Sequence, residues 1–134
     1  MKYSIKANSY AKDNAVIPIK ETFIKFGTTA ESVDTLANPA ELFLSSFAAC
    51  ILKNVERFSE LMKFQYIDAA IEVSATRLEK PPRMDEIEYR LVIHTHQPDI
   101  NAELLKKNIE KFGTIFNTVQ RSCVIKGTVR CVLP

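Results

Sequence analysis

The chain lacks most of the features that would identify a function at first sight. It contains no tryptophan and only three glycines, which argues against a glycine-rich phosphate-binding loop. Its formal net charge is only +2, and no run of lysine or arginine exceeds two residues, so nucleic acids and anionic membranes are poor candidates for partners. Three cysteines are too few for a disulfide scaffold in 134 residues. In a reducing compartment such thiols are either buried bystanders or redox groups.

The sequence also lacks a recognisable targeting or membrane segment. The amino terminus (MKYSIK) has no apolar core of a signal peptide. The longest apolar stretch is far shorter than the roughly 20 residues that span a bilayer. We therefore expect a soluble, cytoplasmic protein that folds as a single domain over residues 1–134, with a core that is stable without disulfides.

The chain is organised around a predicted helix over residues 38–62. Almost every residue from 42 to 52 is apolar or small, which is typical of a helix buried in a core or in a subunit interface. Asn38 is a good N-cap and Pro39 suits the first helical position. Glu41 lies where the carboxylate of a capping box is expected. Polar residues return after position 52, so the second half of this helix is predicted to be amphipathic.

Alternating apolar and polar residues predict strands on both sides of this helix. The segment before it, residues 1–37, is predicted to form a meander of three short strands. These strands cover residues 2–8, 15–19 and 21–26. After the helix, residues 67–78 and 87–93 alternate around the proline-containing link 79–83, which indicates an antiparallel hairpin with one buried face.

A second long helix is predicted to begin near Asn101. Its apolar positions recur at intervals of four and three residues along one face, at Leu105, Ile109, Phe112, Phe116 and Val119. Four more residues lead to Cys123, which lies on the same buried stripe if the helix continues that far. Gly113 weakens the middle of this helix slightly. A last strand is expected over residues 124–133, with residues 126–127 turning into it, and the order of elements predicts an α+β domain.

Cys50 is the first candidate for chemistry. It lies in the middle of the apolar helix, and Ala48 and Ala49 leave room beside its sulfur. A free cysteine in such a helix is more often a packing residue than a catalytic one. Apolar surroundings also disfavour a charged thiolate unless a cation lies nearby, and the local sequence supplies no cation. A supporting lysine or arginine would therefore have to come from elsewhere in the fold.

Cys123 changes this assessment, because two thiols on the buried stripes of two helices can meet. A thiolate that attacks the O–O bond of a peroxide becomes a sulfenic acid, and a second thiol can then condense with it to a disulfide. The alternative is that both are ordinary core cysteines, which spacing alone does not exclude. We take Cys131, on the last strand, as structural.

Three other polar residues were weighed as site residues. Glu41 has a structural interpretation as the capping-box partner of Asn38, and it lies about 13 Å before Cys50 along a helix. It reaches Cys50 only through a bent helix or from another subunit. His94 and His96 have the spacing of a ligand pair, but without a third histidine or a carboxylate cluster we expect no metal site. We expect no bound cofactor.

Three stretches of the sequence resemble the OsmC/Ohr family. Residues 38–50 (NPAELFLSSFAAC) resemble the central-helix motif of that family. Residues 80–89 (KPPRMDEIEY) resemble its proline pair leading into a strand, and residues 122–124 (SCV) resemble its second-cysteine motif. The three landmarks match in order and spacing, and they point to the broader OsmC-like branch rather than to Ohr proper.

The resemblance implies an OsmC-like α+β fold, in which antiparallel sheets surround two long central helices in an intertwined homodimer. It implies thiol-dependent reduction of hydroperoxides, organic ones above all, as a defence against oxidative stress. By position, Cys50 is the attacking thiol and Cys123 the resolving thiol, and Glu41 is the third residue assigned to the site. The reducing equivalents come from an external dithiol, and the family binds no metal or organic cofactor.

Three positions depart from the pattern of the organic-hydroperoxide branch. Ala40 follows the helix-starting proline where that branch has a carboxylate, and no arginine precedes Arg57 to hold the thiolate. Lys20 or Lys25 can supply charge, but without the bidentate geometry of arginine. Cys123 also lacks a following proline. Two alternative functions stay open, a non-catalytic protein that binds a small apolar molecule at the dimer interface and a purely structural dimeric domain.

Overall fold

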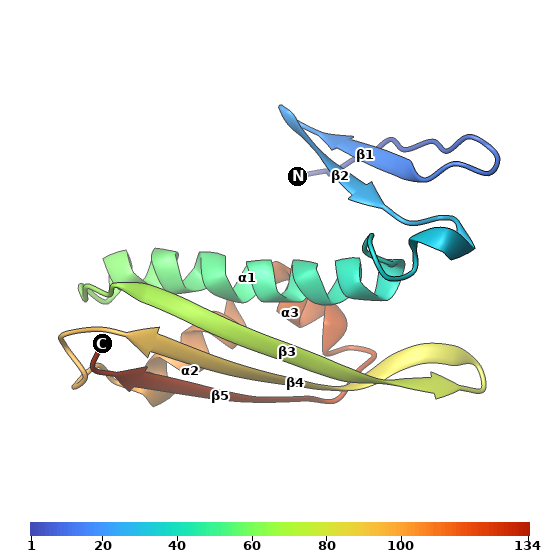
Figure 1. The fold of residues 1–134 in the computed structure, drawn as a ribbon. Helices are drawn as coiled ribbons and strands as arrows, with labels where there is room; N and C mark the ends of the chain where they lie inside the picture. The colour runs from blue at the N-terminus through green and yellow to red at the C-terminus, as the bar shows by residue number, and fades with distance from the viewer. The chain divides into compact units, whose positions relative to one another are not determined.

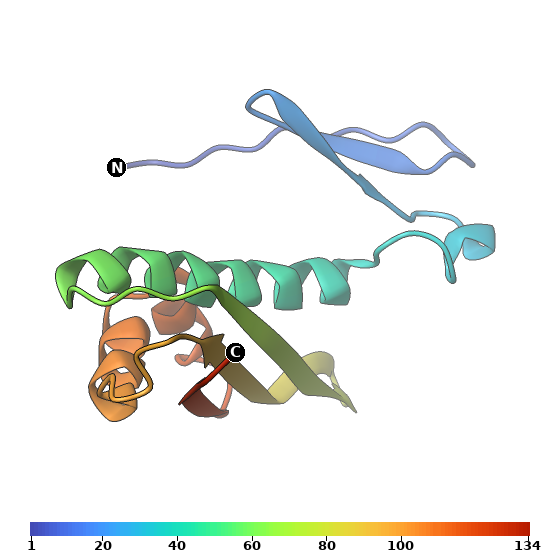
Figure 2. The same ribbon diagram turned by 60° about the vertical axis from the view of Figure 1, so that its left-hand side comes forward.

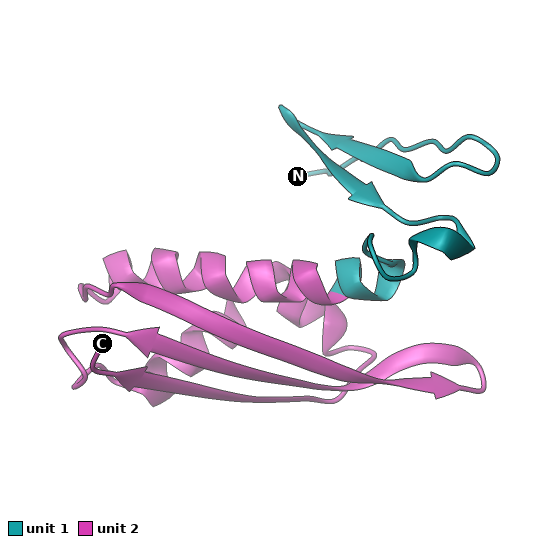
Figure 3. Cartoon of the chain, in the orientation of Figure 1, with its two compact units in different colours: residues 1–43 teal, residues 44–134 magenta.

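The computed structural model describes all residues from 1 to 134, and they form two compact units, residues 1–43 and 44–134 (Figure 3). In chain order the elements are β1 (Ala15–Ile19), β2 (Thr22–Phe26), the 3-10 helix η1 (Ala30–Ser32), α1 (Pro39–Leu61), β3 (Asp68–Glu79), β4 (Pro82–His94), α2 (Ala102–Lys111), α3 (Thr114–Val119) and β5 (Ile125–Val132) (Figure 1). The predicted α+β class is confirmed. None of the helices is both long and apolar enough to cross a bilayer.

The first unit is built on an antiparallel hairpin of β1 and β2, paired from Ala15 with Phe26 to Ile19 with Thr22. The side-chain oxygen of Asn14 accepts hydrogen bonds from the backbone N–H groups of Thr28 and Thr29, at 3.0 and 3.2 Å, and so ties the two ends of the hairpin together. The predicted strand over residues 2–8 is wrong. Only an isolated bridge from Asn8 to Val16 forms there, because an alternating pattern becomes a strand only where a partner strand completes its hydrogen bonds.

The start of α1 follows the expected capping pattern. The side-chain Oδ1 of Asn38 accepts a hydrogen bond from the N–H of Glu41 at 2.8 Å, and the Glu41 carboxylate accepts one from the N–H of Asn38 at 3.1 Å. These reciprocal bonds satisfy two backbone donors that a helix start leaves without partners. The capping-box interpretation of Glu41 is therefore confirmed.

Beyond its first turns, α1 is buried along one face rather than all round. The buried residues of this face are Phe47, Ile51, Asn54, Val55, Phe58 and Ser59. Ala49 and Lys53 are exposed in the single chain, and Phe43 retains 36% of its exposure. The single chain therefore buries only one face of α1, and burial of the apolar first half in a subunit interface stays a prediction.

The second unit contains a three-stranded sheet in the order β3-β4-β5. β3 and β4 form the predicted antiparallel hairpin, although β4 already begins at Pro82, inside the expected break. β5 pairs with β4 in parallel, so the sheet is mixed rather than antiparallel throughout. The helices α1, α2 and α3 lie on one face of this sheet (Figures 1 and 2). On β4 the side chains of Ile87, Tyr89, Leu91 and Ile93 point into that core and are almost fully buried.

The predicted second long helix is divided in two at Gly113. Gly113 has an extended backbone (φ −83°, ψ 113°) and becomes the N-cap of α3, which runs only to Val119. Glycine is a poor residue for a helix interior, which allows the break at this point. The apolar stripe still serves the core, because Leu105, Ile109 and Phe116 are buried. The expectation that one helix continues to Cys123 is wrong.

Gly127 lies within β5 and does not form the turn that was expected there. It pairs with Tyr89 on β4, and the ring of Tyr89 crosses directly over it. A Cβ added at Gly127 would lie only 1.9 Å from a ring carbon (Cε1) of Tyr89, a distance that no side chain tolerates. Because Gly127 has no side chain, the ring of Tyr89 can lie directly over it in the core.

Candidate functional site

Cys50 lies on the buried side of α1, between residues that hold this helix against α2 and α3. One turn earlier, the ring of Phe47 packs on the ring of Phe116, with the centroids 5.8 Å apart. One turn later, the side-chain amide of Asn54 donates a hydrogen bond to the backbone oxygen of Ile109 at 3.4 Å. Cys50 itself is partly buried and its thiol is free. The contacts of Phe47 and Asn54 thus fix the position of Cys50 between them on α1.

The residue that faces the sulfur of Cys50 is Gly113. A Cβ added at Gly113 would lie 3.1 Å from Cys50 Sγ, and 3.0 Å from both the backbone oxygen of Ile109 and the Cβ of Phe116. The sulfur therefore meets bare backbone at the junction of α2 and α3. From the sequence, Gly113 is predicted only to weaken the middle of a helix. The signal that marks it is a glycine that interrupts an otherwise regular apolar stripe.

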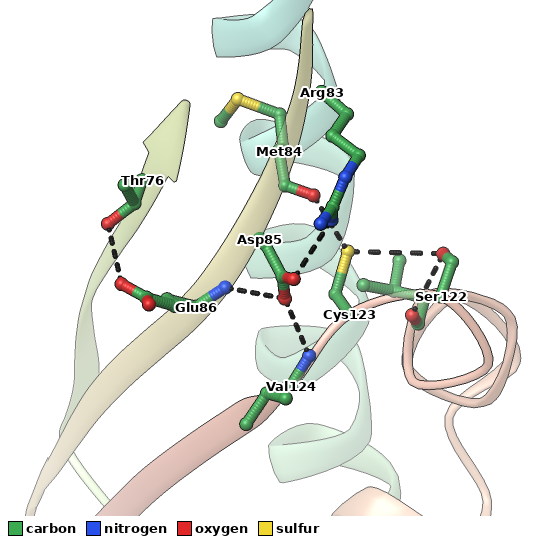
Figure 4. A network of polar contacts seen from close by, with 9 residues as sticks. Thr76, Arg83, Met84, Asp85, Glu86, Ser122, Cys123 and Val124 are labelled. Carbon is green, nitrogen blue, oxygen red and sulfur yellow. Dashed lines mark hydrogen bonds and ion pairs between the residues drawn. The ribbon is translucent and has the colours of Figure 1, made fainter. Parts of the chain in front are cut away.

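Cys123 lies at a different place, in the turn between α3 and β5. Its backbone N–H bonds to the oxygen of Val119 at 2.9 Å, and its S–H donates to the backbone oxygen of Met84 at 3.3 Å (Figure 4). The hydroxyl of Ser122 is 3.9 Å from the same sulfur. Cys123 thus joins the end of α3 to the beginning of β4.

Asp85 stabilises the backbone on both sides of this junction. Its carboxylate accepts hydrogen bonds from the N–H groups of Val124 and Glu86, at 2.9 and 2.8 Å, and from the guanidinium of Arg83 at 2.9 Å (Figure 4). The bond from Val124, followed by those from Arg83 and Glu86, lowers the pKa of Asp85 to about 2. An ionised carboxylate therefore holds β4 and β5 together next to Cys123.

An open surface pocket of about 450 Å³ borders Cys123. Its lining consists of Glu110, Lys111, Phe116, Asn117, Gln120, Cys123 and Ile125. Cys50 does not belong to this lining. Tyr89 is fully buried in the core beneath, and its hydroxyl has no hydrogen-bond partner. Burial, with the negative charge of Glu110 adding to it, raises the pKa of Tyr89 above its ordinary value.

The other residues selected from the sequence are distributed over the chain. Cys131 lies on β5, is partly buried and packs against the core, and burial raises the pKa of its thiol. His94 forms a close pair with Asp68, with 2.6 Å between Nδ1 and Oδ1. The chain holds no group of three or more His, Cys, Asp or Glu side chains arranged to bind a metal ion. The catalytic roles of Cys50, Cys123 and Glu41 stay predictions.

Comparison with known proteins shows the family of this chain. The model of the family described as OsmC-like protein matches residues 32–128, which include α1, β3, β4, both shorter helices and the first half of β5. The chain belongs to this family. The matched stretch contains both Cys50 and Cys123. A search of curated protein sequences found no significant match.

Solved structures of OsmC-like proteins share the fold over nearly the whole chain. An OsmC-like protein from Mycoplasma pneumoniae superposes with a TM-score of 0.86 at 18% identity, covering 98% of both chains. An organic hydroperoxide resistance protein from Elizabethkingia anophelis gives a TM-score of 0.74 at 16% identity, covering 98% of this chain and 99% of the other. One from Legionella pneumophila gives 0.68 at 16% identity, covering 96% and 97%. At such identities the likeness establishes the fold alone.

Proposed function

We propose that this OsmC-like protein is a thiol-dependent reductase of hydroperoxides, organic ones above all, in which Cys50 attacks the peroxide. The observation that supports this most directly is the place of Cys50. Cys50 is partly buried on α1 and its sulfur faces Gly113, a residue that has no side chain to place against it. Several structural neighbours are described as organic hydroperoxide resistance proteins, which agrees with this assignment.

The reaction requires only one thiolate in its first step. The Cys50 sulfur attacks the terminal oxygen of R–O–O–H, the O–O bond breaks, and the sulfur is oxidised by two electrons to a sulfenic acid. The released alkoxide takes up a proton and leaves as the alcohol. Two electrons and two protons from thiols then return Cys50 to its starting state, so the protein itself is unchanged after each cycle.

The test compares peroxide consumption by three proteins with cumene hydroperoxide as substrate and dithiothreitol as reductant. Cys50→Ser removes the attacking sulfur, and we expect its rate to fall to the uncatalysed background. Cys131→Ser is the matched control, because Cys131 lies on β5 and packs against the core. Its rate should equal that of the unmodified protein. Undiminished turnover in Cys50→Ser would overturn the proposal and favour a binding or structural role for the scaffold.

We also propose that the protein works as a homodimer. The homodimer is what the resemblance to the OsmC/Ohr family implies, and within the second unit Leu61, Leu104 and Phe112 keep 63%, 44% and 46% of their exposure, which leaves apolar surface for a partner subunit to cover. Size-exclusion chromatography with light scattering gives the mass directly. A mass of one chain at the concentration of the peroxide assay would contradict this part of the proposal.

A further inference from the structure

We infer that the thiol which resolves oxidised Cys50 comes from outside this chain, because the position that faces its sulfur at disulfide distance is Gly113. The catalytic part of this inference rests on the proposed function. Its geometric part, which concerns Gly113, Cys50 and Cys123, does not depend on that function. It departs from the expectation that Cys123 resolves Cys50. Three observations support it, namely the geometry at Gly113, the placement of Cys123 and the register of the helices.

The geometry at Gly113 matches that of a disulfide. With an S–S bond of about 2.0 Å, the Cβ of one half-cystine lies about 3 Å from the sulfur of the other. The Cβ position of Gly113 is 3.1 Å from Cys50 Sγ. The backbone of Gly113 has φ −83° and ψ 113°, which any residue can adopt. A cysteine at this position would therefore reach Cys50 with little movement, yet the chain has no thiol there.

Cys123 lies beyond the opposite end of α3. Gly113 is the N-cap of that helix, and Cys123 follows its last residue, Val119, by one turn. Six helical residues alone extend about 9 Å. A disulfide requires Cα atoms within about 7 Å of each other. The sulfur of Cys123 is moreover held by the backbone oxygen of Met84 on β4.

The register between the helices separates the two thiols in the same way. Asn54 contacts Ile109, Cys50 faces Gly113, and Phe47 packs on Phe116. Each step backward along α1 is thus a step forward along α2 and α3, which shows that the helices run antiparallel here. Continuing from Phe116 to Cys123 therefore leads away from Cys50.

An external thiol completes the cycle with balanced chemistry. Its thiolate attacks the sulfenic sulfur of Cys50, an S–S bond forms, and the S–O bond breaks to release hydroxide, which is protonated to water. A second thiolate then attacks the external sulfur of this mixed disulfide, forms the external disulfide and releases Cys50 as a thiolate. A dithiol supplies both steps from one molecule. A monothiol leaves a mixed disulfide until a second molecule arrives.

The geometric part is tested without peroxide, by oxidising the folded protein with diamide and mapping disulfides by peptide mass. We expect the unmodified protein to give no Cys50–Cys123 link. Gly113→Cys should give nearly complete linkage of Cys50 to the introduced cysteine. Gly113→Ala is the matched control for crowding, since its Cβ meets the same atoms of Ile109 and Phe116 without adding a thiol. A rapid Cys50–Cys123 link in the unmodified protein would overturn the inference even if Gly113→Cys fails to fold.

The catalytic part is tested with one equivalent of cumene hydroperoxide and no added thiol. We expect a parallel sample treated with dimedone to carry the dimedone adduct on Cys50, and the sample without dimedone to gain the mass of one oxygen atom on Cys50, with Cys123 still free. Adding glutathione should convert this species to a Cys50 mixed disulfide, and adding dithiothreitol should restore the free thiol. Peroxide consumption that yields a Cys50–Cys123 disulfide instead would refute external resolution while leaving the proposed reductase standing. No oxidation of Cys50 would refute both.

Discussion

Cys50, which faces the beginning of α3, and Cys123, which follows its end, have opposite kinds of surroundings. The sulfur of Cys50 faces the bare backbone of Gly113, between two helix contacts that fix its position. The sulfur of Cys123 donates to the oxygen of Met84 and lies beside a carboxylate that binds three donors. The first arrangement sets a sulfur against a residue without a side chain, and the second uses a sulfur to join a helix to a strand.

The comparison shows that the place of a cysteine in a sequence motif does not determine its surroundings in the fold. In the sequence, Cys50 lies in an apolar helix and Cys123 continues the spacing of an apolar stripe, which suggests that the two thiols act together. In the fold, a nucleophile needs a path for its substrate, whereas a junction residue needs partners. Cys123 meets the second requirement, and the proposed function requires that Cys50 meet the first. Variants that change the surroundings of Cys50 but not those of Cys123, or the reverse, therefore test the comparison.

The largest effect is expected from Gly127→Ala, which should damage both surroundings at once. The new Cβ would lie 1.9 Å from the ring of Tyr89, which is fully buried and packs against Phe47 with centroids 6.1 Å apart. The ring must move out of the core, and we expect a loss of about 3 kcal/mol in the free energy of unfolding, at the upper end of overpacking costs. Urea unfolding measures this loss.

A shorter side chain at position 89 provides the control for that variant. Tyr89→Leu removes the ring that collides with the added methyl group, although it leaves a cavity of its own. The double variant Gly127→Ala with Tyr89→Leu should therefore be more stable than the sum of the two single losses predicts. Strict additivity would show that the ring and the glycine do not interact and that the close approach is not the cause.

A smaller effect, confined to the Cys123 side, is expected from Asp85→Asn. The substitution keeps an oxygen for the N–H of Val124 but removes the charge that faces Arg83. We expect a modest fall in Tm at pH 6 and a severalfold faster alkylation of Cys123 by iodoacetamide. Cys50 should react at its unchanged rate, because none of its observed contacts involves Asp85. Faster alkylation of Cys50 would show that the two surroundings are coupled.

The stability difference between the unmodified protein and Asp85→Asn should depend on pH. The folded-state pKa of Asp85 is lowered from 3.8 to about 2, so its contribution to stability is present above pH 3.8. It is lost as the pH falls from there toward 2, because the folded and unfolded states then bind the proton equally. The difference in Tm between the unmodified protein and Asp85→Asn should shrink over this interval. A difference that stays constant down to pH 2 would contradict the lowered pKa.

The sequence predicted those parts of the fold whose signals are local. The capping box of Asn38 and Glu41, the long helix after it and the hairpin around the prolines follow from short-range patterns, and the structure contains all three. The strand at residues 2–8 failed because pairing depends on a partner that the pattern does not reveal. The parallel pairing of β5 with β4 is likewise a long-range property.

The candidate site was predicted less completely than the fold, and for a related reason. Cys50 and Cys123 were selected by residue type, which the sequence displays. Gly113 and Gly127 were missed in their roles, because a glycine matters through what its absent side chain would meet. That information exists only once Cys50 and Tyr89 are in place. Asp85 was missed because its three donors come from the backbone and from a neighbouring side chain.

The smallest effect concerns Cys131, the third cysteine of the chain, whose surroundings differ from those of Cys50 and Cys123. Its thiol lies on β5 against the core, and burial raises its pKa. Because the thiolate is the reactive form, a higher pKa leaves less of it at pH 8 and shifts the alkylation profile to higher pH. We expect Cys131 to react with iodoacetamide more slowly than Cys50 in the same sample, as measured by peptide mass between pH 7 and 10. If Cys131 reacted first, the position of Cys50 beside Gly113 would not be what makes a thiol of this protein reactive.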